Sequence, residues 1–372
     1  MVELANFMSG PFATLMLADL GAEVIKVEQP RGDPFRRWGR PDTYVSAVFA
    51  NCNHGKRSVV LDLKDPDGVD ALLRLLEHAD VLVCNWRPDV AARLGIGDEV
   101  LAGRNRRLIR LYVSGFGPTG PLADEPAFDT VVQARAAMTE ALSTTGEPTL
   151  GAGYPVDKLT AIMAVQAVLA ALLTRTTSGR GERIDLAMLD AASYLSFVDL
   201  YTGRTFVDHE PAEAVNRHSS AVRPVRTSDG WLLVAPVTGA DIRRACEAVG
   251  RPEWGEDILS APDQVNLVHA LFDRIETVTV AASTEVWLGR FRAHDVPVAP
   301  CLSVDEHLAD PQVDHNGVYR VVEWPDAGAV RVARYPARFS SFGPLVADAP
   351  APPLGADTEA VLRRLGIEPA AG

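Results

Sequence analysis

One segment, from Tyr154 to Leu189, constrains the fold of this chain more than any other part of the sequence. It contains a run of Leu, Ile, Val, Met and Ala that begins just after Pro155 and ends shortly before Gly179. Because Pro is favoured at the first position of a helix and Gly just past its end, the run predicts a single helix. Apolar residues cover nearly every side of it, which predicts a helix that is buried all round. A strand at residues 184–188, with alternating apolar side chains, is expected to follow.

Asp157 lies in the first turn of this predicted helix, and its position allows two interpretations. Asp is favoured as a helix cap, because the positive end of the helix dipole stabilises a carboxylate. A carboxylate nucleophile also has to stay ionised while it is shielded from water, and a helix N-terminus favours the ionised form. The segment by itself is compatible with both a cap and a nucleophile.

The composition narrows the class of protein. The chain has 372 residues, of which 47% are hydrophobic, and is long enough for two or three domains. Its apolar stretches are interrupted within about 18 residues, so neither a membrane span nor a leader is expected. Four cysteines without CxxC spacing favour a cytoplasmic location and argue against zinc. The net charge of −13 disfavours nucleic acid, but residues 1–110 hold 15 basic and 15 acidic side chains, so an anionic ligand is expected to bind there.

The order of the predicted elements indicates an α/β fold. Strands and helices alternate from a strand–helix–strand unit at residues 2–28 to about residue 200. Only Gly10 of the three fingerprint glycines is present, so no NAD site is expected. We predict a Rossmann-like large domain with a parallel sheet and a smaller α+β domain. The predicted boundaries are 1–200 for the large domain, 201–219 for a linker, 220–300 for the small domain, 301–335 for a return linker and 336–372 for a C-terminal segment that packs on the large domain.

Candidate ligand-binding residues lie at the ends of the predicted strands. Asn85 and Trp86 follow the apolar strand at 81–84, at the edge where open α/β sheets bind ligands, and Lys64 ends the preceding strand. Trp86 is suited to stacking on a base, and Lys64 and Arg93 to binding phosphates. These residues favour a large, anionic and partly aromatic ligand such as a nucleotide-tailed thioester, although core packing of Trp86 and solvent exposure of Lys64 are the alternatives. The eight histidines show no metal-binding spacing, and no G-x-S-x-G or P-loop motif is present.

Motifs along nearly the whole chain give the sequence a close resemblance to the class III coenzyme A transferases of the CaiB/BaiF type. These are Gly10-Pro11, LADLGAEVIKVE at 17–28, GKRS at 55–58, LDLK at 61–64, NWRP at 85–88, SGFGPTGP at 114–121, GRGE at 179–182 with Asp185, DGW at 229–231, VPVAP at 296–300 and Leu354-Gly355.

The resemblance implies specific roles and an assembly. Asp157 matches the family's nucleophilic aspartate, so a capping role becomes a supporting one. CoA is implied as part of an acyl-CoA substrate and not as a permanently bound cofactor. The residues implied to contact it are Leu61, Lys64, Asn85, Trp86, Val90, Arg93 and Leu94. The resemblance also implies a small carboxylic acid as the second substrate, and an interlocked homodimer.

Racemases of the same family provide the main alternative activity. They exchange a proton at the α-carbon with a His and an Asp. The position of that His is Phe128 here, and the racemase Asn four residues before Asp157 is Gly153, so we favour a CoA-transferase over a racemase. Compared with formyl-CoA transferases, Met8 replaces a Gln and Pro126 a Lys, which disfavours oxalate and formate as substrates. A catalytically silent CoA- or nucleotide-binding protein and a dehydrogenase are the alternatives from other classes.

Overall fold

The computed structural model describes residues 1–39, 45–86, 88–143, 146–209, 222–260, 264–341 and 349–367. The chain divides into a large unit, Met1–Leu195 with His315–Gly372, and a second unit, Ser196–Asp314. The large unit contains β1 (Val2–Leu4), α1 (Ser9–Asp19), β2 (Ile25–Glu28), η1 (Pro34–Arg37), α2 (Ala47–Asn53), β3 (Arg57–Val60), α3 (Pro66–Glu77), β4 (Val81–Cys84), α4 (Pro88–Arg93), α5 (Asp98–Arg104), β5 (Ile109–Ser114), α6 (Asp129–Arg135), α7 (Met138–Ala141), α8 (Pro155–Ser178), β6 (Arg183–Ala187), β10 (Tyr319–Trp324), β11 (Gly328–Ala333) and α17 (Thr358–Arg364).

The second unit has its own elements and core. It contains η2 (Thr202–Arg204), β7 (Val225–Arg226), β8 (Trp231–Val234), α11 (Gly239–Ala248), α12 (Glu253–Ser260), α13 (Gln264–Thr279), α14 (Thr284–Ala293), β9 (Val298–Pro300) and α15 (Val304–Leu308), while α9 (Met188–Phe197) and α16 (Pro311–Asn316) cross the two boundaries. The antiparallel sheet β7-β8-β9 packs with its helices around Phe272, Trp287 and Phe291. Residues 210–219 of the expected linker, and Arg87 of the NWRP motif, lie outside the described residues.

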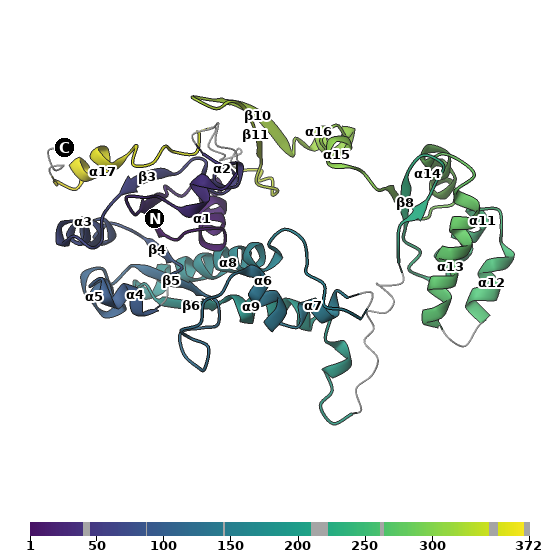
Figure 1. Ribbon diagram of the computed structural model, residues 1–372, viewed down its shortest axis with the longest axis horizontal. Helices are drawn as coiled ribbons and strands as arrows, with labels where there is room; N and C mark the ends of the chain where they lie inside the picture. The colour runs from purple at the N-terminus through teal and green to yellow at the C-terminus, as the bar shows by residue number, and fades with distance from the viewer. Residues whose placement is uncertain are drawn as a thin grey trace. The chain divides into compact units, whose positions relative to one another are not determined.

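Six parallel strands form the sheet of the large unit, in the order β3-β2-β1-β4-β5-β6 (Figure 1). The predicted α/β class and parallel sheet are therefore confirmed. The strand order reverses between β1 and β4, and open α/β sheets bind ligands beyond the carboxyl ends of the strands at such a point. The residues that follow Leu4 and Cys84 are consequently the first place to look for a site.

Both faces of the sheet are covered, as the all-apolar sequence of β4 predicts. Leu82 and Cys84 of β4 belong to one core with α3, α5 and α17, whereas Val81 and Val83 belong to a second core with α1, α6 and α8. Since successive side chains of a strand point to opposite faces, these two sets define the two layers of helices.

Helix α8 differs from the prediction that it is buried all round. Ala161, Ala164 and Val168 are buried against the sheet, but Ile162, Leu169 and Leu173 are 46%, 45% and 72% exposed. The sheet covers only one side of the helix in a single chain, so the apolar residues on the other side remain open to solvent.

Helix α8 is long and apolar enough to cross a membrane by length and composition alone. The 24 residues of α8 include an 18-residue window with a mean hydropathy of 1.8, of which 39% is buried. This combination is shared by the core helices of many proteins, and the buried side of α8 packs on the sheet as such a helix does.

Strand β3 is shifted from its predicted position. It pairs with β2 from Arg57 to Val60, whereas the sequence predicted a strand that ends at Lys64. The Leu61 N–H still donates to the Glu28 carbonyl, and the chain then turns towards α3. Lys64 therefore lies in a loop beyond the carboxyl end of the strand.

The C-terminal segment closes the free edge of β3 (Figure 1). The Asp357 carboxylate accepts a hydrogen bond of 2.9 Å from the Ser58 N–H, and the Thr358 hydroxyl accepts one of 3.0 Å from the Val60 N–H. The Asp357 N–H donates in turn to the Ser58 carbonyl. These bonds give partners to backbone groups that an edge strand otherwise leaves open.

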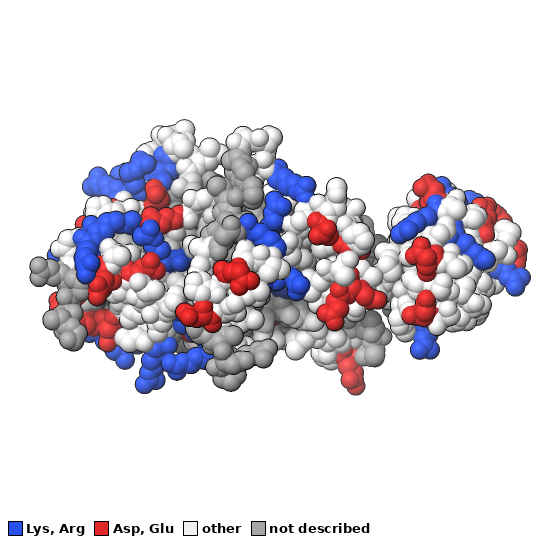
Figure 2. Space-filling model, turned by 90° about the horizontal axis from the view of Figure 1, so that it is seen from above, with Lys and Arg blue, Asp and Glu red and all other residues white. Residues whose placement is uncertain are grey.

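The charges of the large unit are mixed on the face that Figure 2 shows, where Lys and Arg side chains are interspersed with those of Asp and Glu. The first 110 residues likewise contain equal numbers of basic and acidic side chains. A binding site for an anion is thus expected from local groupings of basic residues and not from the overall field of the protein.

Candidate active site

A cavity of about 830 Å³ lies at the carboxyl edge of the sheet, beyond β2, β3 and β4. Six of the seven residues predicted to bind CoA line it: Leu61, Lys64, Trp86, Val90, Arg93 and Leu94. The loop after β2 adds Gln29, Pro30 and Arg31, which the sequence analysis did not select. A volume of this size is typical of a small-molecule site, and its position agrees with the rule for open α/β sheets.

The lining of this cavity combines basic and apolar groups. Lys64, Arg93 and Arg31 supply positive charge, while Leu61, Val90 and Leu94 supply apolar surface. Two carboxylates, Glu28 and Asp62, also line the cavity, and Glu28 is paired with Arg36. Trp86 is half-buried and packs against the apolar core beneath the sheet, so it has a structural role in addition to lining the cavity. Such a combination suits a ligand with both phosphate and apolar parts.

Asn85, the seventh predicted residue, has a different position. Its side-chain oxygen accepts a hydrogen bond of 3.0 Å from the Asn6 N–H, and its side-chain nitrogen donates one of 2.8 Å to the Asn6 carbonyl. Asn85 thus ties the end of β4 to the turn between β1 and α1, across the point where the strand order reverses. Its amide holds this turn and is not part of the cavity lining.

Asp157 is half-buried in the first turn of α8, and another aspartate serves this end of the helix. The Asp157 N–H donates a hydrogen bond of 2.9 Å to a carboxylate oxygen of Asp129, at the start of α6. Asp129 is fixed by Gln133 at 2.5 Å, and Gln133 accepts from the Gly151 N–H at 2.8 Å. Asp129 therefore caps α8 from outside, and the Asp157 carboxylate accepts its hydrogen bond from the Ser9 side chain.

The surroundings of Asp157 change its acidity. Burial raises the pKa of its carboxyl to about 6, the neighbouring Asp129 carboxylate contributes in the same direction, and the hydrogen bond from Ser9 partly opposes both. A carboxylate with a raised pKa is more basic and a better nucleophile than an ordinary one, while it is still ionised above pH 6. Perturbed carboxyl groups of this kind are concentrated at functional sites.

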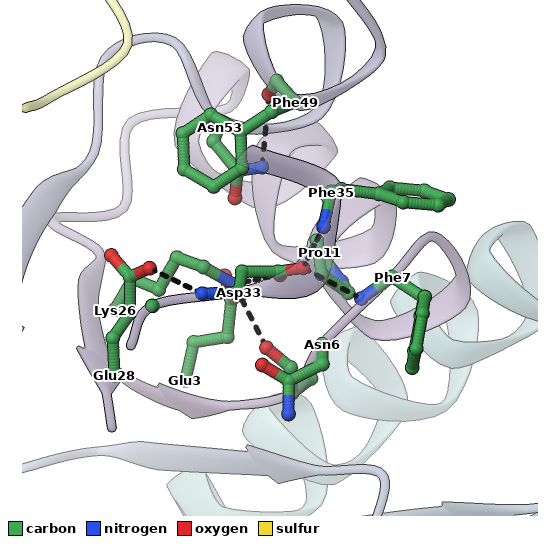
Figure 3. Close-up of polar contacts among 12 residues, drawn as sticks. Glu3, Asn6, Phe7, Pro11, Lys26, Glu28, Asp33, Phe35, Phe49 and Asn53 are labelled. Carbon is green, nitrogen blue, oxygen red and sulfur yellow. Dashed lines mark hydrogen bonds and ion pairs between the residues drawn. The ribbon is translucent and has the colours of Figure 1, made fainter. Parts of the chain in front are cut away.

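A buried ionic cluster fixes the turn between β1 and α1 (Figure 3). Lys26 contacts Glu3 at 2.6 Å and Asp33 at 2.9 Å, and Lys56 contacts Glu3 at 2.8 Å; all four side chains are fully buried. Burial alone would raise the pKa of Glu3, but the two lysines outweigh it and hold that pKa at about 2. The same burial lowers the pKa of Lys56 to about 8, because Glu3 offsets only part of it.

Asp33 links this cluster to the turn by hydrogen bonds. Its carboxylate accepts hydrogen bonds from the N–H groups of Phe7, at 3.3 Å, and Phe35, at 2.9 Å. Phe7 has a φ of +64°, a left-handed conformation that is unfavourable for a bulky residue. In Figure 3, Asp33 lies between Glu28 on one side and Phe7 and Phe35 on the other. The turn is thus held in a strained conformation next to Ser9, the residue that contacts Asp157.

Five residues of this region were not among the predicted site residues: Ser9, Asp33, Lys26, Glu3 and Asp129. One signal was available, since Glu3 and Lys26 stand within short apolar strands that are expected to be buried on both faces. A charged residue in such a strand needs a buried partner. The partners themselves lie on other elements and have no signature in the local sequence.

A second cavity, of about 670 Å³, lies at the amino edge of the sheet, where Met1, Ile25 and Val81 begin their strands. The ends of parallel strands that bind ligands in open α/β sheets are the opposite ones, so we do not place the site there. Within the described part of the chain, no group of three or more His, Cys, Asp or Glu side chains is arranged to hold a metal ion.

Comparison with known proteins identifies the class. The profile of CoA-transferase family III matches residues 1–358, and the chain belongs to this family. It is 36% identical over 384 aligned positions to the succinate–glutarate CoA-transferase of Agrobacterium fabrum, covering 98% of this chain and 94% of that protein. It is 30% identical to the formyl-CoA:oxalate CoA-transferase of Shigella sonnei, covering 98% and 94% of the two chains. A crystal structure of a CAIB/BAIF family protein from Brucella suis superimposes with a TM-score of 0.84 at 29% identity, over 98% and 97% of the chains. The predicted family and the predicted enzyme class are therefore confirmed.

Proposed function

We propose that this protein transfers CoA from an acyl-CoA donor to a carboxylic acid acceptor through covalent intermediates on Asp157. The observation that carries the proposal is the half-buried Asp157 carboxylate, whose pKa is raised to about 6. Its side-chain partner Ser9 follows the turn between β1 and α1. Asn85 joins that turn to the end of β4, at the edge of the sheet where the cavity lies. Relatives are named for succinate, glutarate, formate and oxalate, all of them carboxylic acids.

The reaction proceeds by four displacements that balance without a redox change. The Asp157 carboxylate attacks the thioester carbonyl, the C–S bond breaks, and CoA leaves as a thiolate from a mixed anhydride. The thiolate attacks the aspartyl carbonyl, releasing the donor acid and leaving an aspartyl-CoA thioester. The acceptor carboxylate attacks this thioester and forms a second anhydride with renewed loss of thiolate. The thiolate then attacks the acceptor's acyl carbonyl, so that the acceptor departs as its CoA ester and Asp157 is free again.

The cavity residues hold the CoA part of both thioesters in this proposal. Lys64 and Arg93 bind phosphate groups by charge-assisted hydrogen bonds, and Trp86 stacks on the adenine. Leu61, Val90 and Leu94 bind apolar parts of CoA, while Asn85 keeps the adjoining turn in place. Replacing Lys64 or Arg93 with Ala is expected to raise KM for acyl-CoA with a smaller change in kcat.

Each displacement develops negative charge on a carbonyl oxygen. The first N–H groups of a helix lack partners within the helix and lie at the positive end of its dipole. In α1 these belong to Ser9 and Gly10, next to the side chain that contacts Asp157. We assign stabilisation of the oxyanion to them. The anhydrides also require exclusion of water, because they hydrolyse.

The racemase alternative is disfavoured by the groups around Asp157. A racemase needs a second acid or base on the opposite face of the α-carbon. The position of the family's His is occupied by Phe128, whose ring cannot exchange a proton, and Gly153 replaces the Asn. A catalytically silent CoA-binding protein would have no use for a strongly perturbed carboxyl in this position.

The test is to trap the covalent intermediate. Purified protein is incubated with acetyl-, succinyl- and benzoyl-CoA, treated with hydroxylamine and analysed by peptide mapping. Modification of the peptide that carries Asp157, and its loss in Asp157→Ala, is expected. Asp67→Ala, which removes an exposed carboxylate from the first turn of α3, is the matched control and keeps the modification. Transfer by Asp157→Ala, or exchange of deuterium at the α-carbon without transfer to any acid, would refute the proposal.

The assembly and location follow the same proposal. The exposed apolar side of α8, with Ile162, Leu169 and Leu173, supports a homodimer that covers it, of the interlocked kind that the family resemblance implies. Leu173→Glu is expected to lower the sedimentation coefficient to that of a monomer. The four cysteines are unpaired, which supports the proposed cytoplasmic location. The large domain, linkers, small domain and C-terminal segment predicted from the sequence are proposed as the domains of each subunit.

A further inference from the structure

Four aromatic rings, Phe128, Phe7, Phe35 and Trp38, contact one another in series and form an aromatic patch for which the proposed CoA chemistry gives no role. Phe128 and Trp38 are 59% and 58% exposed, and Phe7 is half-buried between them and the core. The Phe7 ring lies edge-to-face with Phe128 at a centroid distance of 5.3 Å and with Phe35 at 5.4 Å; Phe35 in turn lies 5.8 Å from Trp38. Large aromatic side chains exposed together need a partner that covers them.

The patch adjoins the proposed nucleophile on two sides. Phe128 directly precedes Asp129, whose carboxylate accepts the Asp157 N–H at 2.9 Å. Phe7 is two residues before Ser9, whose side chain donates to the Asp157 carboxylate. The two rings that touch each other are therefore anchored to the two residues that touch Asp157. Phe7 and Phe128 are thus two residues and one residue along the chain from the groups that contact Asp157.

Phe7 has a left-handed backbone conformation that is energetically unfavourable for a residue of its size. Its left-handed conformation is enforced by the N–H bond to Asp33, which the buried Lys26 holds in place. Strained residues of this kind are concentrated at functional sites and ligand clamps. Asn or Gly would adopt this conformation with less strain, and in this conformation the Phe7 ring contacts those of Phe35 and Phe128.

The charges at this place favour one chemical class of acid. Of the described groups around the patch, Ser9 is neutral and Asp129 is a carboxylate, while the cations next to Trp38 and Asp157 in the chain, Arg37 and Lys158, are exposed to solvent. A dicarboxylate would bring its second negative charge towards Asp129 and into aromatic surroundings, which is unfavourable. An aryl group instead stacks or makes edge-to-face contacts with Phe7, Phe128 and Trp38.

We propose that Phe7, Trp38 and Phe128 form the binding surface for the acyl group, and that the acceptor is a monocarboxylic acid bearing an aromatic group. This inference rests on the proposed function of Asp157 and adds the class of substrate to it. The rings contact the acyl group, and the reacting atoms remain those of Asp157, the thiolate and the carboxylate.

The test separates the two proposals. The aspartyl-CoA enzyme is first formed from an acyl-CoA that is labelled in its CoA part, and one sample is trapped with hydroxylamine at Asp157, which depends on the proposed function alone. The untrapped aspartyl-CoA enzyme is offered benzoate, phenylacetate, cinnamate, succinate, glutarate and acetate, and transfer of the labelled CoA is measured. Aryl acids are expected to have kcat/KM at least tenfold above those of the dicarboxylates. If no adduct forms at Asp157, the proposed function fails; if the adduct forms but dicarboxylates react best, only the aromatic surface is refuted.

Variants assign the preference to the rings. Phe128→Ala is expected to lower kcat/KM for aryl acids about tenfold, mainly through KM, because one ring–ring contact and its buried area are lost. The ratio of kcat/KM for aryl acids to kcat/KM for acetate is expected to fall, and Phe128→Tyr, which keeps the ring, retains the preference. Trp38→Ala provides an independent second loss. An unchanged acid preference together with a lower sedimentation coefficient in Phe128→Ala would overturn the proposal and assign the patch to a second copy of the chain.

Discussion

Replacing Asp157 with Asn is expected to stabilise the fold while it abolishes CoA transfer. Burial and the neighbouring Asp129 raise the pKa of the Asp157 carboxyl from its ordinary 3.8 to about 6, so the folded protein resists the ionisation that the unfolded chain allows. Since a tenfold change in an ionisation constant is about 1.4 kcal/mol, this difference opposes folding by about 3 kcal/mol once both states are ionised. Asn has nearly the same shape, keeps an acceptor for Ser9 and carries no charge.

The sign of the effect changes with pH in a defined way. The unfolded chain loses the proton first as pH rises above 3.8, so the free energy of unfolding falls between pH 3.8 and about 6 and is lowest above that range. Asp157→Asn is therefore expected to gain up to about 3 kcal/mol at pH 8, and only about 1.5 kcal/mol at pH 5, where the penalty is half developed.

The assay is urea unfolding at pH 8 and pH 5, at one protein concentration, because association makes the stability of an oligomer depend on concentration. Asp67→Asn is the matched control. It removes an exposed carboxylate from the first turn of α3 and is expected to lose about 0.3–1 kcal/mol of favourable interaction with the helix dipole. A less stable Asp157→Asn at pH 8, or a gain of equal size at both pH values, would show that ionisation of the Asp157 carboxyl does not destabilise the folded protein.

Three further changes test the surroundings of the site. Glu3→Gln leaves its buried lysine partners without their carboxylate and is expected to lower the free energy of unfolding by about 3–5 kcal/mol; an unchanged urea midpoint would contradict this. Gly10→Ala would place a Cβ 2.3 Å from that of Ala5, so helix α1 has to move, with an expected loss of about 1–3 kcal/mol and slower transfer. Asp129→Asn removes a like charge and is expected to shift the acid limb of the pH–rate profile, set by Asp157, to lower pH; a limb that stays in place would argue that burial alone sets this pKa.

Local sequence signals were sufficient for the layout of the large unit. Pro155 and Gly179 bracket α8 as predicted, and the apolar strand at 81–84 is β4. These predictions succeeded because caps and apolar periodicity act over a few residues. The CoA-binding residues lie where strands end, which topology fixes, and six of the seven consequently line one cavity.

The sequence was insufficient where partners come from elsewhere. The composition of α8 predicted burial on every side, but the single sheet covers only one. The interaction of Asp157 with Asp129 joins the starts of two helices 28 residues apart, and nothing in either segment specifies the other. Asn85 was predicted as a ligand-binding residue from its place after β4, and only the structure shows that its amide is bound to the Asn6 backbone.

The bonds between β3 and the C-terminal segment have a consequence for biosynthesis. Ser58 and Val60 receive their partners Asp357 and Thr358 from positions 299 and 298 residues further on. During nearly the whole of translation the backbone groups on the free edge of β3 therefore have no partners. They are paired only when the segment that begins α17 has left the ribosome. A chain that a stop codon ends between Ala333 and Asp357 would retain every described strand and the proposed nucleophile, yet would leave the edge of β3 unpaired, which favours aggregation.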